Sequence, residues 1–442
     1  MTKRGVDELE LHFKQFSDVP REVIIKEDIL RLGLGFSEAA LDAAKGFQVK
    51  SYRLFTYDKV KYDELEKGEP FRAPESIQIK GGLYELQRTN IGVRFNPNSP
   101  YLVDVIDDTV SLYKNGTLIA DIKYPPRPRY YSKTFDDGTQ YNEIVPLSCS
   151  GTMAFATVFR VCQFWGEKEE CKFCDINENI RQGKKHGKLA VPKTYKPVQQ
   201  VAEVMEEIFL KESAPGGVRP LSYIITGGAI TGKVAGKQED DFYLEYVEAV
   251  KDRIGNRWPC VLQSIAKDKK TCKNYKAAGV DVHHANIEVW DKNLFKIICP
   301  GKDKYVGWDE WVRRLVESVD VFGEGNVTPN FVAGVEMAQP YGFKDVTSAV
   351  KSTTEGLEYL MSRGVVVRFN HWNVSPLSAL AGGQPPPLEY FIRVDQAWCE
   401  TWTKYSLPPI GAMHTLGPGR GAFLMSGNVD MDPVRCGGKG YG

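Results

Sequence analysis

The sequence has no excess of charge, no long apolar run and no sequence repeat, and each absence excludes a class of protein. Lys and Arg total 57, as do Asp and Glu, so no bulk charge attracts nucleic acid or an anionic membrane. No run of about 18 apolar residues is present, which excludes a membrane-spanning helix. The N-terminal stretch MTKRGVDELELHFKQF lacks the apolar core of a signal peptide, which predicts a cytoplasmic protein.

Cysteine is also scarce. Nine cysteines among 442 residues are too few for a disulfide scaffold, and their number is odd. Six of them are scattered along the chain, whereas Cys162, Cys171 and Cys174 are clustered. In a reducing compartment, clustered cysteines are more often metal ligands or catalytic groups than disulfide partners.

The length and a hydrophobic content of 42% predict two or three globular domains. Residues 1–145 contain short β-prone runs separated by turn signals: SIQIKG, NIGVRF, YLVDVI, TVSLY, TLIADIKY and YNEIV. An Asn-Gly pair between TVSLY and TLIADIKY predicts a hairpin. We expect a small β-rich N-terminal domain at 1–145, an α/β domain at 146–380, and a C-terminal cover with a flexible tail at 381–442.

The central segment alternates strands with helices. Strands are expected at 153–159, 221–226, 260–265, 282–290, 327–335 and 365–372. Between them, apolar residues recur three or four positions apart, as on one face of a helix. Such alternation predicts a parallel sheet, either an open doubly wound sheet or a partial (β/α)6 barrel.

The clustered cysteines form the pattern C-x8-C-x2-C directly after the first of these strands. Their position at the carboxyl end of a strand is where α/β folds build their sites. Three thiolates suit a [4Fe–4S] cluster that leaves one iron free for another ligand. Zinc would need a fourth ligand, and the nearest histidine is His186, twelve residues after Cys174. Three unrelated core cysteines are the remaining interpretation.

The cysteine loop, with the aromatic Phe173 just before its last cysteine, resembles the cluster loop of the radical S-adenosylmethionine (SAM) superfamily. The commonest spacing there is C-x3-C-x2-C, so the first gap is longer here. The stretches ATVFRVCQFWGEKEECKFCDIN and IICPGK are similar to the biotin-synthase-like radical SAM proteins of nitrilase gene clusters, over roughly residues 85–375. The resemblance implies a partial (β/α)6 TIM-like barrel in which the three thiolates hold a [4Fe–4S] cluster and SAM chelates the fourth iron.

Segments at the ends of three later strands resemble SAM-binding motifs of this superfamily. The segment ITGGA is similar to the GGE motif that receives the SAM amino group, NIE to the pattern that holds its ribose, and VAGVE to the region that flanks its adenine. Asn and Glu of NIE would face the same way if they lie on a strand. Together with Phe173, the residues that the resemblance assigns to cofactor binding are Thr226, Gly227, Gly228, Ala229, Asn286, Glu288 and Gly334.

The last two strands carry the candidates for the catalytic and substrate-binding side, which are Glu336, Arg368 and Asn370. Arg368 and Asn370 share one strand face by their spacing of two. An arginine inside a strand needs a carboxylate or phosphate partner, from substrate, SAM or a structural glutamate. Lys302 in IICPGK is a candidate partner for the SAM carboxylate.

The resemblance implies a radical SAM enzyme. The reduced cluster would cleave SAM to a 5′-deoxyadenosyl radical that abstracts hydrogen from a small-molecule or cofactor-precursor substrate. It also implies an electron donor such as flavodoxin or ferredoxin. Two alternatives stay open: a radical SAM enzyme that modifies a peptide or protein, and a non-catalytic zinc- or iron-binding scaffold.

Overall fold

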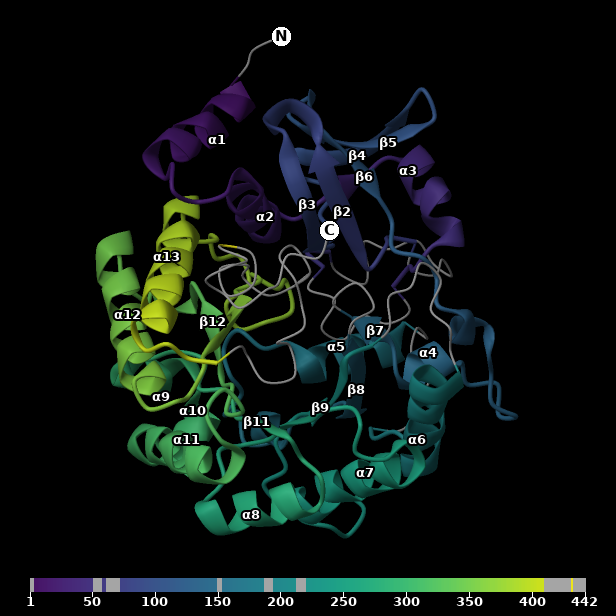
Figure 1. The fold of residues 1–442 in the computed structure, drawn as a ribbon, viewed down its shortest axis with the longest axis vertical. Helices are drawn as coiled ribbons and strands as arrows, with labels where there is room; N and C mark the ends of the chain where they lie inside the picture. Colours follow the sequence, from purple (N-terminus) through teal and green to yellow (C-terminus); the bar gives the residue numbers. More distant parts are fainter. Residues whose placement is uncertain are drawn as a thin grey trace.

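The computed structural model describes residues 4–50, 58–60, 72–148, 153–186, 194–211, 220–408 and 431. Figure 1 shows an N-terminal sheet with its helices at the top and a strand-and-helix barrel below it. None of the helices in these described ranges combines the length and apolar character that a membrane crossing requires.

The N-terminal part is built around a six-stranded sheet in the order β1-β4-β5-β6-β2-β3. Its strands are β1 (Gly35–Phe36), β2 (Ser76–Gly81), β3 (Leu86–Gly92), β4 (Tyr101–Ile106), β5 (Thr109–Lys114) and β6 (Thr117–Lys123). Helices α1 (Arg4–Gln15), α2 (Arg21–Leu32) and α3 (Glu38–Ala43) accompany it. The predicted hairpin is confirmed: Asn115 and Gly116 connect β5 to β6 with φ of 48° and 80°.

The central part contains six parallel strands that follow one another in chain order. They are β8 (Met153–Phe159), β9 (Ser222–Gly227), β10 (Cys260–Gln263), β11 (Val282–His284), β12 (Asn330–Ala333) and β13 (Arg368–His371). Pairing is parallel from β8 to β11 and from β12 to β13, and parallel bridges at His283–Val327 and Glu288–Phe331 join the two sets. The short β7 (Leu147–Ser148) lies antiparallel beside β8. The partial (β/α)6 TIM-like barrel is therefore confirmed (Figure 1).

Helices surround these strands, and several of them lie where the apolar periodicity predicts a helix. They are α4 (Tyr141–Ile144), α5 (Ile176–Lys185), α6 (Val198–Glu206), α7 (Glu239–Ile254), α8 (Lys269–Ala277), α9 (Lys292–Ile298), α10 (Pro300–Tyr305), α11 (Trp308–Phe322), α12 (Val346–Met361) and α13 (Leu388–Lys404). Local caps fix their ends: Asp268 accepts from Thr271 N–H at 2.8 Å at the start of α8, and Gly255 ends α7 with φ of 71°. The run YNEIV, expected as β, forms α4 instead.

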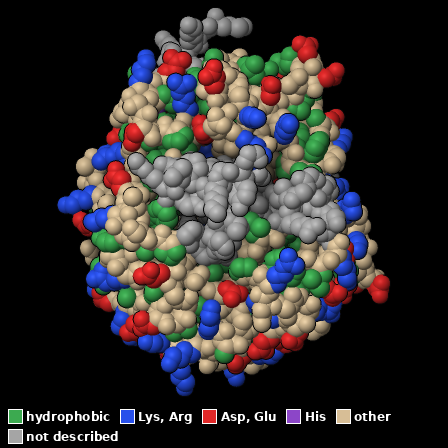
Figure 2. Space-filling model, in the orientation of Figure 1, with side chains coloured by type: hydrophobic (Ala, Val, Ile, Leu, Met, Phe, Trp, Pro, Cys, Tyr) green, Lys and Arg blue, Asp and Glu red, His purple; other side chains and the backbone are tan. Residues whose placement is uncertain are grey.

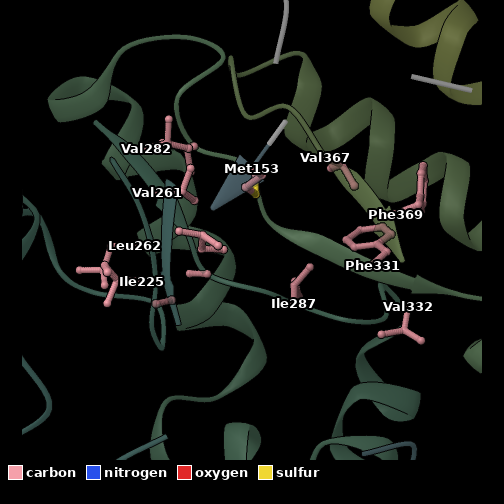
Figure 3. Packing of buried hydrophobic residues seen from close by; sticks show 14 of the residues in the cluster. Met153, Ile225, Val261, Leu262, Val282, Ile287, Phe331, Val332, Val367 and Phe369 are labelled. Atoms are coloured by element: carbon pink, nitrogen blue, oxygen red, sulfur yellow. The ribbon is translucent and has the colours of Figure 1, made fainter. Parts of the chain in front are cut away.

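The barrel core is formed by apolar residues of the strands and of the helices around them. On β12 and β13, Phe331 and Phe369 pack edge to face with ring centroids 6.0 Å apart (Figure 3). The residues next to Phe331 and Phe369 on each strand point the opposite way, because side chains alternate along a strand. Both faces of β12 are buried, and Asn330 and Val332 on one of them line a cavity.

Helix α13 takes part in both hydrophobic cores. Leu388 and Ile392 pack in the N-terminal core, whereas Phe391 and Trp398 pack in the barrel core. The domain boundaries expected at residues 145 and 380 stay predictions. The expected flexible tail falls on residues 409–430 and 432–442, outside the described residues.

The charges of the chain are mixed on the face seen in Figure 2. Lys and Arg side chains alternate there with Asp and Glu, and no large field of one sign forms among the coloured atoms. This distribution matches the net charge of zero.

Candidate active site

The carboxyl ends of the barrel strands surround a cavity of about 260 Å³. Parallel barrels place their sites at this end because side chains from several strand ends meet there. Sequence-predicted residues that line the cavity are Cys162, Cys171, Phe173, Cys174, Gly227, Gly228, Ala229, Asn286, Glu288, Arg368 and Asn370. Three other predicted residues, Thr226, Gly334 and Glu336, are not part of its lining.

The loop after β8 carries all three clustered thiols, and hydrogen bonds fix its course. The Cys162 N–H donates to the Asn177 side-chain oxygen at 2.6 Å, and the Asn177 amide donates back to the Cys162 carbonyl at 2.9 Å. The Gln163 side-chain oxygen accepts from the N–H groups of Thr231 and Gly232, each at 2.7 Å. The loop is thus tied to α5 on one side and to the segment after β9 on the other.

The chemistry of this donor set fits an iron–sulfur cluster. Burial, followed by the nearby Cys171, raises the pKa of Cys162 to about 12, and burial also raises the pKa of Cys174. Thiolates here need a compensating positive charge, which bound iron supplies. In the described part of the chain, no three Cys, His, Asp or Glu side chains converge on one position that could hold a metal ion. His186, the histidine nearest in sequence to the cysteine loop, does not line the cavity.

The paired glycines after β9 let the backbone pass directly beneath the cysteine loop. A Cβ on Gly228 would lie 2.1 Å from the Val161 carbonyl oxygen and 2.5 Å from the Cys162 Cα, which only glycine avoids. The Gly228 carbonyl accepts from the Tyr243 hydroxyl at 2.8 Å, and the Ala229 carbonyl accepts from Gln163 N–H at 2.9 Å. Each carbonyl keeps a second lone pair for a ligand.

Thr226 contacts a residue of the cavity wall without lining the cavity itself. Its hydroxyl donates to the Gln263 side-chain oxygen at 2.8 Å, and Gln263 itself lines the cavity. Thr226 therefore orients a lining residue.

The predicted strand at 282–290 is too long, so the alternation expected for Asn286 and Glu288 is wrong. Strand β11 ends at His284, and Glu288 has a left-handed backbone with φ of 71°. Its backbone still pairs with β12: its N–H donates to the Asn330 carbonyl at 2.9 Å, and its carbonyl accepts from Val332 N–H at 2.8 Å. Both side chains nevertheless line the cavity, because this segment turns at the strand end.

Glu288 forms an ion pair with Lys302 at 2.6 Å. The Lys302 ammonium also donates to the Asn286 carbonyl at 2.6 Å and lies 4.8 Å from the centroid of the Trp311 ring. The side chains of Lys302 and Glu288 are only 11% and 8% exposed. Burial alone would lower the pKa of Lys302, but the Glu288 carboxylate, together with Cys171 and Cys299, raises it. Lys302 thus has a carboxylate partner within the protein, which the sequence did not predict.

Glu336 lies behind the cavity wall. Strand β12 ends at Ala333 and Gly334 turns with φ of 97°, so the expected strand face does not extend to Glu336. The Glu336 carboxylate accepts hydrogen bonds from the hydroxyls of Tyr390 and Thr353 and from Gly334 N–H. Burial raises the pKa of this carboxyl group. Its contacts fix the end of β12 against α12 and α13.

Strands β12 and β13 present a polar face to the cavity, as their alternation predicts. Asn330 lies opposite Arg368 in the parallel register, and both line the cavity with Asn370 and His284. The His284 Nδ1–H donates to the Thr328 carbonyl, which leaves Nε2 as an acceptor. Burial, then the charge of Arg368, lowers the pKa of His284 well below its ordinary value. This wall therefore offers a guanidinium, amides and a neutral imidazole to a ligand.

Sequence reasoning missed the segment after β13. Trp372, Asn373 and Ser375 line the cavity, and the Ser375 hydroxyl donates to Asp175 of the cysteine loop at 2.5 Å. The segment is irregular, so no periodicity marks it. Polar residues directly after the last strand are the signal that could have revealed it.

The chain is similar in sequence and in structure to known proteins. No family model matches the chain. The chain is 24% identical over 325 residues to the bacteriochlorophyllide c C-7(1)-hydroxylase of Chlorobaculum limnaeum, covering 71% of this chain and 75% of the relative. The resemblance of the chain to the radical SAM superfamily and the prediction of an enzyme are confirmed.

Solved structures are similar over part of the chain. Methylornithine synthase (PylB) is 15% identical with a TM-score of 0.39, and the match covers 56% of this chain and 61% of that one. Coproporphyrinogen III oxidase (HemN) from Escherichia coli is 10% identical with a TM-score of 0.34, and the match covers 61% of this chain and 56% of that one. The chain thus spans about three fifths of each of these structures.

Proposed function

We propose that the chain is a radical SAM enzyme that binds a [4Fe–4S] cluster through Cys162, Cys171 and Cys174 and acts on a C–H bond of a small-molecule substrate. When bound, the reduced cluster would supply the one electron that splits SAM into methionine and a 5′-deoxyadenosyl radical, which takes a hydrogen atom from the substrate. The observation that carries the proposal is the close approach of Gly228 to Cys162, which brings the thiol loop and a glycine-lined ligand edge to one cavity.

The residues nearest the thiols would bind SAM. The backbone of Gly227, Gly228 and Ala229 offers carbonyl oxygens to the amino group, while Phe173 and Phe164 close the cavity beside the cluster loop. Glu288 and the Asn286 amide would accept and donate hydrogen bonds to the ribose hydroxyls. Because Lys302 neutralises Glu288 from behind, this carboxylate can stay ionised in a buried place.

The substrate would occupy the wall formed by β12 and β13. Arg368, Asn370 and Asn330 can hold a polar or anionic group there, while the apolar side chains of Phe155, Ile224 and Val332 line other parts of the cavity. Water is thereby kept from the reacting atoms. Glu336 has a positioning role in this proposal, since it binds Gly334, Thr353 and Tyr390 and does not line the cavity.

A small molecule fits the site better than a folded protein. The cavity is about 260 Å³ in volume and lies within the barrel, and the relative in Chlorobaculum limnaeum acts on bacteriochlorophyllide c. The proposal includes a flavodoxin or ferredoxin as electron donor and a reducing, cytoplasmic location, since the cluster must be reduced before SAM is cleaved.

Cysteine substitutions test the proposal. We expect Cys162→Ala, Cys171→Ala or Cys174→Ala to remove the cluster after anaerobic reconstitution, because three thiols are its entire protein ligand set. Cys272→Ala and Cys399→Ala are matched controls: both cysteines are buried and neither lines the cavity. Iron, sulfide and absorbance near 400 nm are measured for each variant. Equal iron loss in the controls, or zinc in place of iron, would contradict the assignment.

A further inference from the structure

The cavity wall formed by β12, β13 and the segment after β13 holds three side chains that each have an unpaired polar atom. Asn330, Trp372 and Asn373 line the cavity and are only 4%, 2% and 7% exposed. The Asn330 Oδ1, the Trp372 Nε1 and the Asn373 Oδ1 have no hydrogen-bond partner among the residues that the structure describes. Buried polar groups in folded proteins are nearly always hydrogen-bonded, because an unpaired one loses its bonds to water without replacement. The three atoms therefore need partners from a ligand.

The chemistry of these atoms defines what the ligand must offer. The two amide oxygens accept hydrogen bonds, so together they need at least two donor hydrogens, which an ammonium group supplies and a single hydroxyl does not. The indole N–H can only donate, so it needs an acceptor. Trp372 and Asn373 are neighbours in sequence, and the Trp372 backbone N–H is held by the Ala333 carbonyl at 2.9 Å. The ligand thus carries a donor group and an acceptor group on one small molecule.

Arg368 identifies the acceptor as an anion. It lies opposite Asn330 in the register of β12 and β13 and lines the same cavity. A guanidinium carries a permanent charge and binds a carboxylate through two parallel N–H bonds. The cavity volume of about 260 Å³ is below the about 300–1,000 Å³ of common ligand pockets, and SAM would occupy part of it. The molecule bound at this wall is therefore a small carboxylate that also carries an ammonium group.

We propose that these four side chains bind the ammonium and carboxylate groups of a free α-amino acid, which is the substrate class of the chain. This inference rests on the proposed function. The ammonium would donate to the two amide oxygens, while the carboxylate would accept from the indole N–H and the guanidinium. Binding of both charged groups fixes the orientation of the amino acid before hydrogen abstraction.

The first test measures the melting temperature of the reconstituted full-length protein with SAM and each proteinogenic L-amino acid. We expect at least one of them to raise the melting temperature and to bind with a measurable dissociation constant. Its N-acetyl derivative, which lacks the ammonium, and its carboxamide, which lacks the carboxylate, should each bind at least about tenfold more weakly, because each leaves buried groups unpaired. Binding by none of the amino acids, or binding of either derivative as tight as that of the amino acid, would overturn the inference.

The second test compares variants with that same amino acid. Trp372→Phe removes the indole N–H and Asn373→Leu removes the amide oxygen, so each should raise the dissociation constant about tenfold. Trp398→Phe is the matched control: Trp398 is 1% exposed, does not line the cavity, and donates its indole N–H to the Val367 carbonyl at 2.8 Å. Because only the control loses a hydrogen bond within the protein, it should lower the melting temperature more than Trp372→Phe and leave the dissociation constant unchanged.

An unchanged dissociation constant in Trp372→Phe or in Asn373→Leu, or an equal rise in Trp398→Phe, would contradict the assignment. Failure of the proposed function is distinguishable, because the protein would then bind no iron–sulfur cluster or release no 5′-deoxyadenosine from SAM. A protein that does both and binds no amino acid would refute this inference alone.

Discussion

Substitution of Glu288 by Gln separates a ligand-binding role of this residue from a structural one. The change keeps the shape of the side chain but removes the charge that faces Lys302 at 2.6 Å. Lys302 then keeps the Asn286 carbonyl and the Trp311 ring as favourable contacts, together with the neutral side-chain oxygen of the Gln. Glu288 also loses the negative charge proposed to accept hydrogen bonds from the SAM ribose.

The expected loss of stability follows from the burial of the pair. Removing one partner of a buried ion pair costs about 3–5 kcal/mol, and the Gln oxygen still accepts from Lys302, so we expect about 3 kcal/mol. At about 2–4 °C per kcal/mol for a unit of this size, the melting temperature falls by about 6–12 °C. The raised pKa of Lys302 means that the pair stabilises the fold below the ordinary value of 10.5 and ceases to do so as the pH rises through the raised value. The deficit of the variant should therefore be full at neutral pH and shrink in strongly alkaline buffer.

The assay measures SAM affinity and melting temperature of the same reconstituted variant. Loss of a charge-assisted hydrogen bond, about 1.5–3 kcal/mol, predicts an affinity at least about tenfold lower, with the cluster retained. Asp28→Asn is the control, because Asp28 forms a similarly buried ion pair with Lys114 at 2.7 Å in the N-terminal part. It should lower the melting temperature and leave SAM affinity unchanged. Unchanged SAM affinity in Glu288→Gln, with a lower melting temperature, would refute the ribose assignment.

Two further predictions concern backbone packing and pH. Gly228→Ala should prevent cluster assembly, because its Cβ would lie 2.1 Å from the Val161 carbonyl oxygen; a full iron content after reconstitution would contradict this reasoning. Burial raises the pKa of Glu75 to about 7, so stability is lost as the pH rises from the ordinary value of 4.5 through 7. Glu75→Gln should therefore raise the free energy of unfolding at pH 8 by up to about 3 kcal/mol, measured as a higher melting temperature, and this gain should vanish at pH 4. Equal gains at both pH values would show that the Glu75 carboxyl does not titrate as described.

The sequence predicted the elements of the barrel whose patterns are local. Apolar runs marked β8 and β13, and helical periodicity marked α7, α11 and α12. Strand lengths were overestimated where an apolar run continues past the strand end: residues 282–290 give only the three-residue β11. The β-prone run YNEIV forms α4, where the Tyr141 hydroxyl donates to Glu203 of α6 at 2.6 Å, a contact that no local propensity encodes.

In the candidate site, too, the sequence revealed the residues that form a local pattern and missed the contacts between distant residues. The three cysteines of one loop could be found because their spacing is short. Lys302 and Glu288 are fourteen residues apart, and their pairing depends on how α10 packs against the end of β11. Glu336 was expected in the cavity because strand alternation was extended past Gly334, whereas Tyr390 of α13, fifty-four residues away, binds it from behind. Contacts of this kind arise from tertiary packing and leave no local pattern.

Release of 5′-deoxyadenosine tests the central claim most directly. The protein is reconstituted anaerobically with iron and sulfide, then incubated with SAM and dithionite, and 5′-deoxyadenosine and methionine are quantified by liquid chromatography. We predict that the unsubstituted protein forms both products in equal amounts and that Cys174→Ala forms neither. A protein that holds its full iron–sulfur cluster and binds SAM, yet releases no 5′-deoxyadenosine under these conditions, would contradict the assignment.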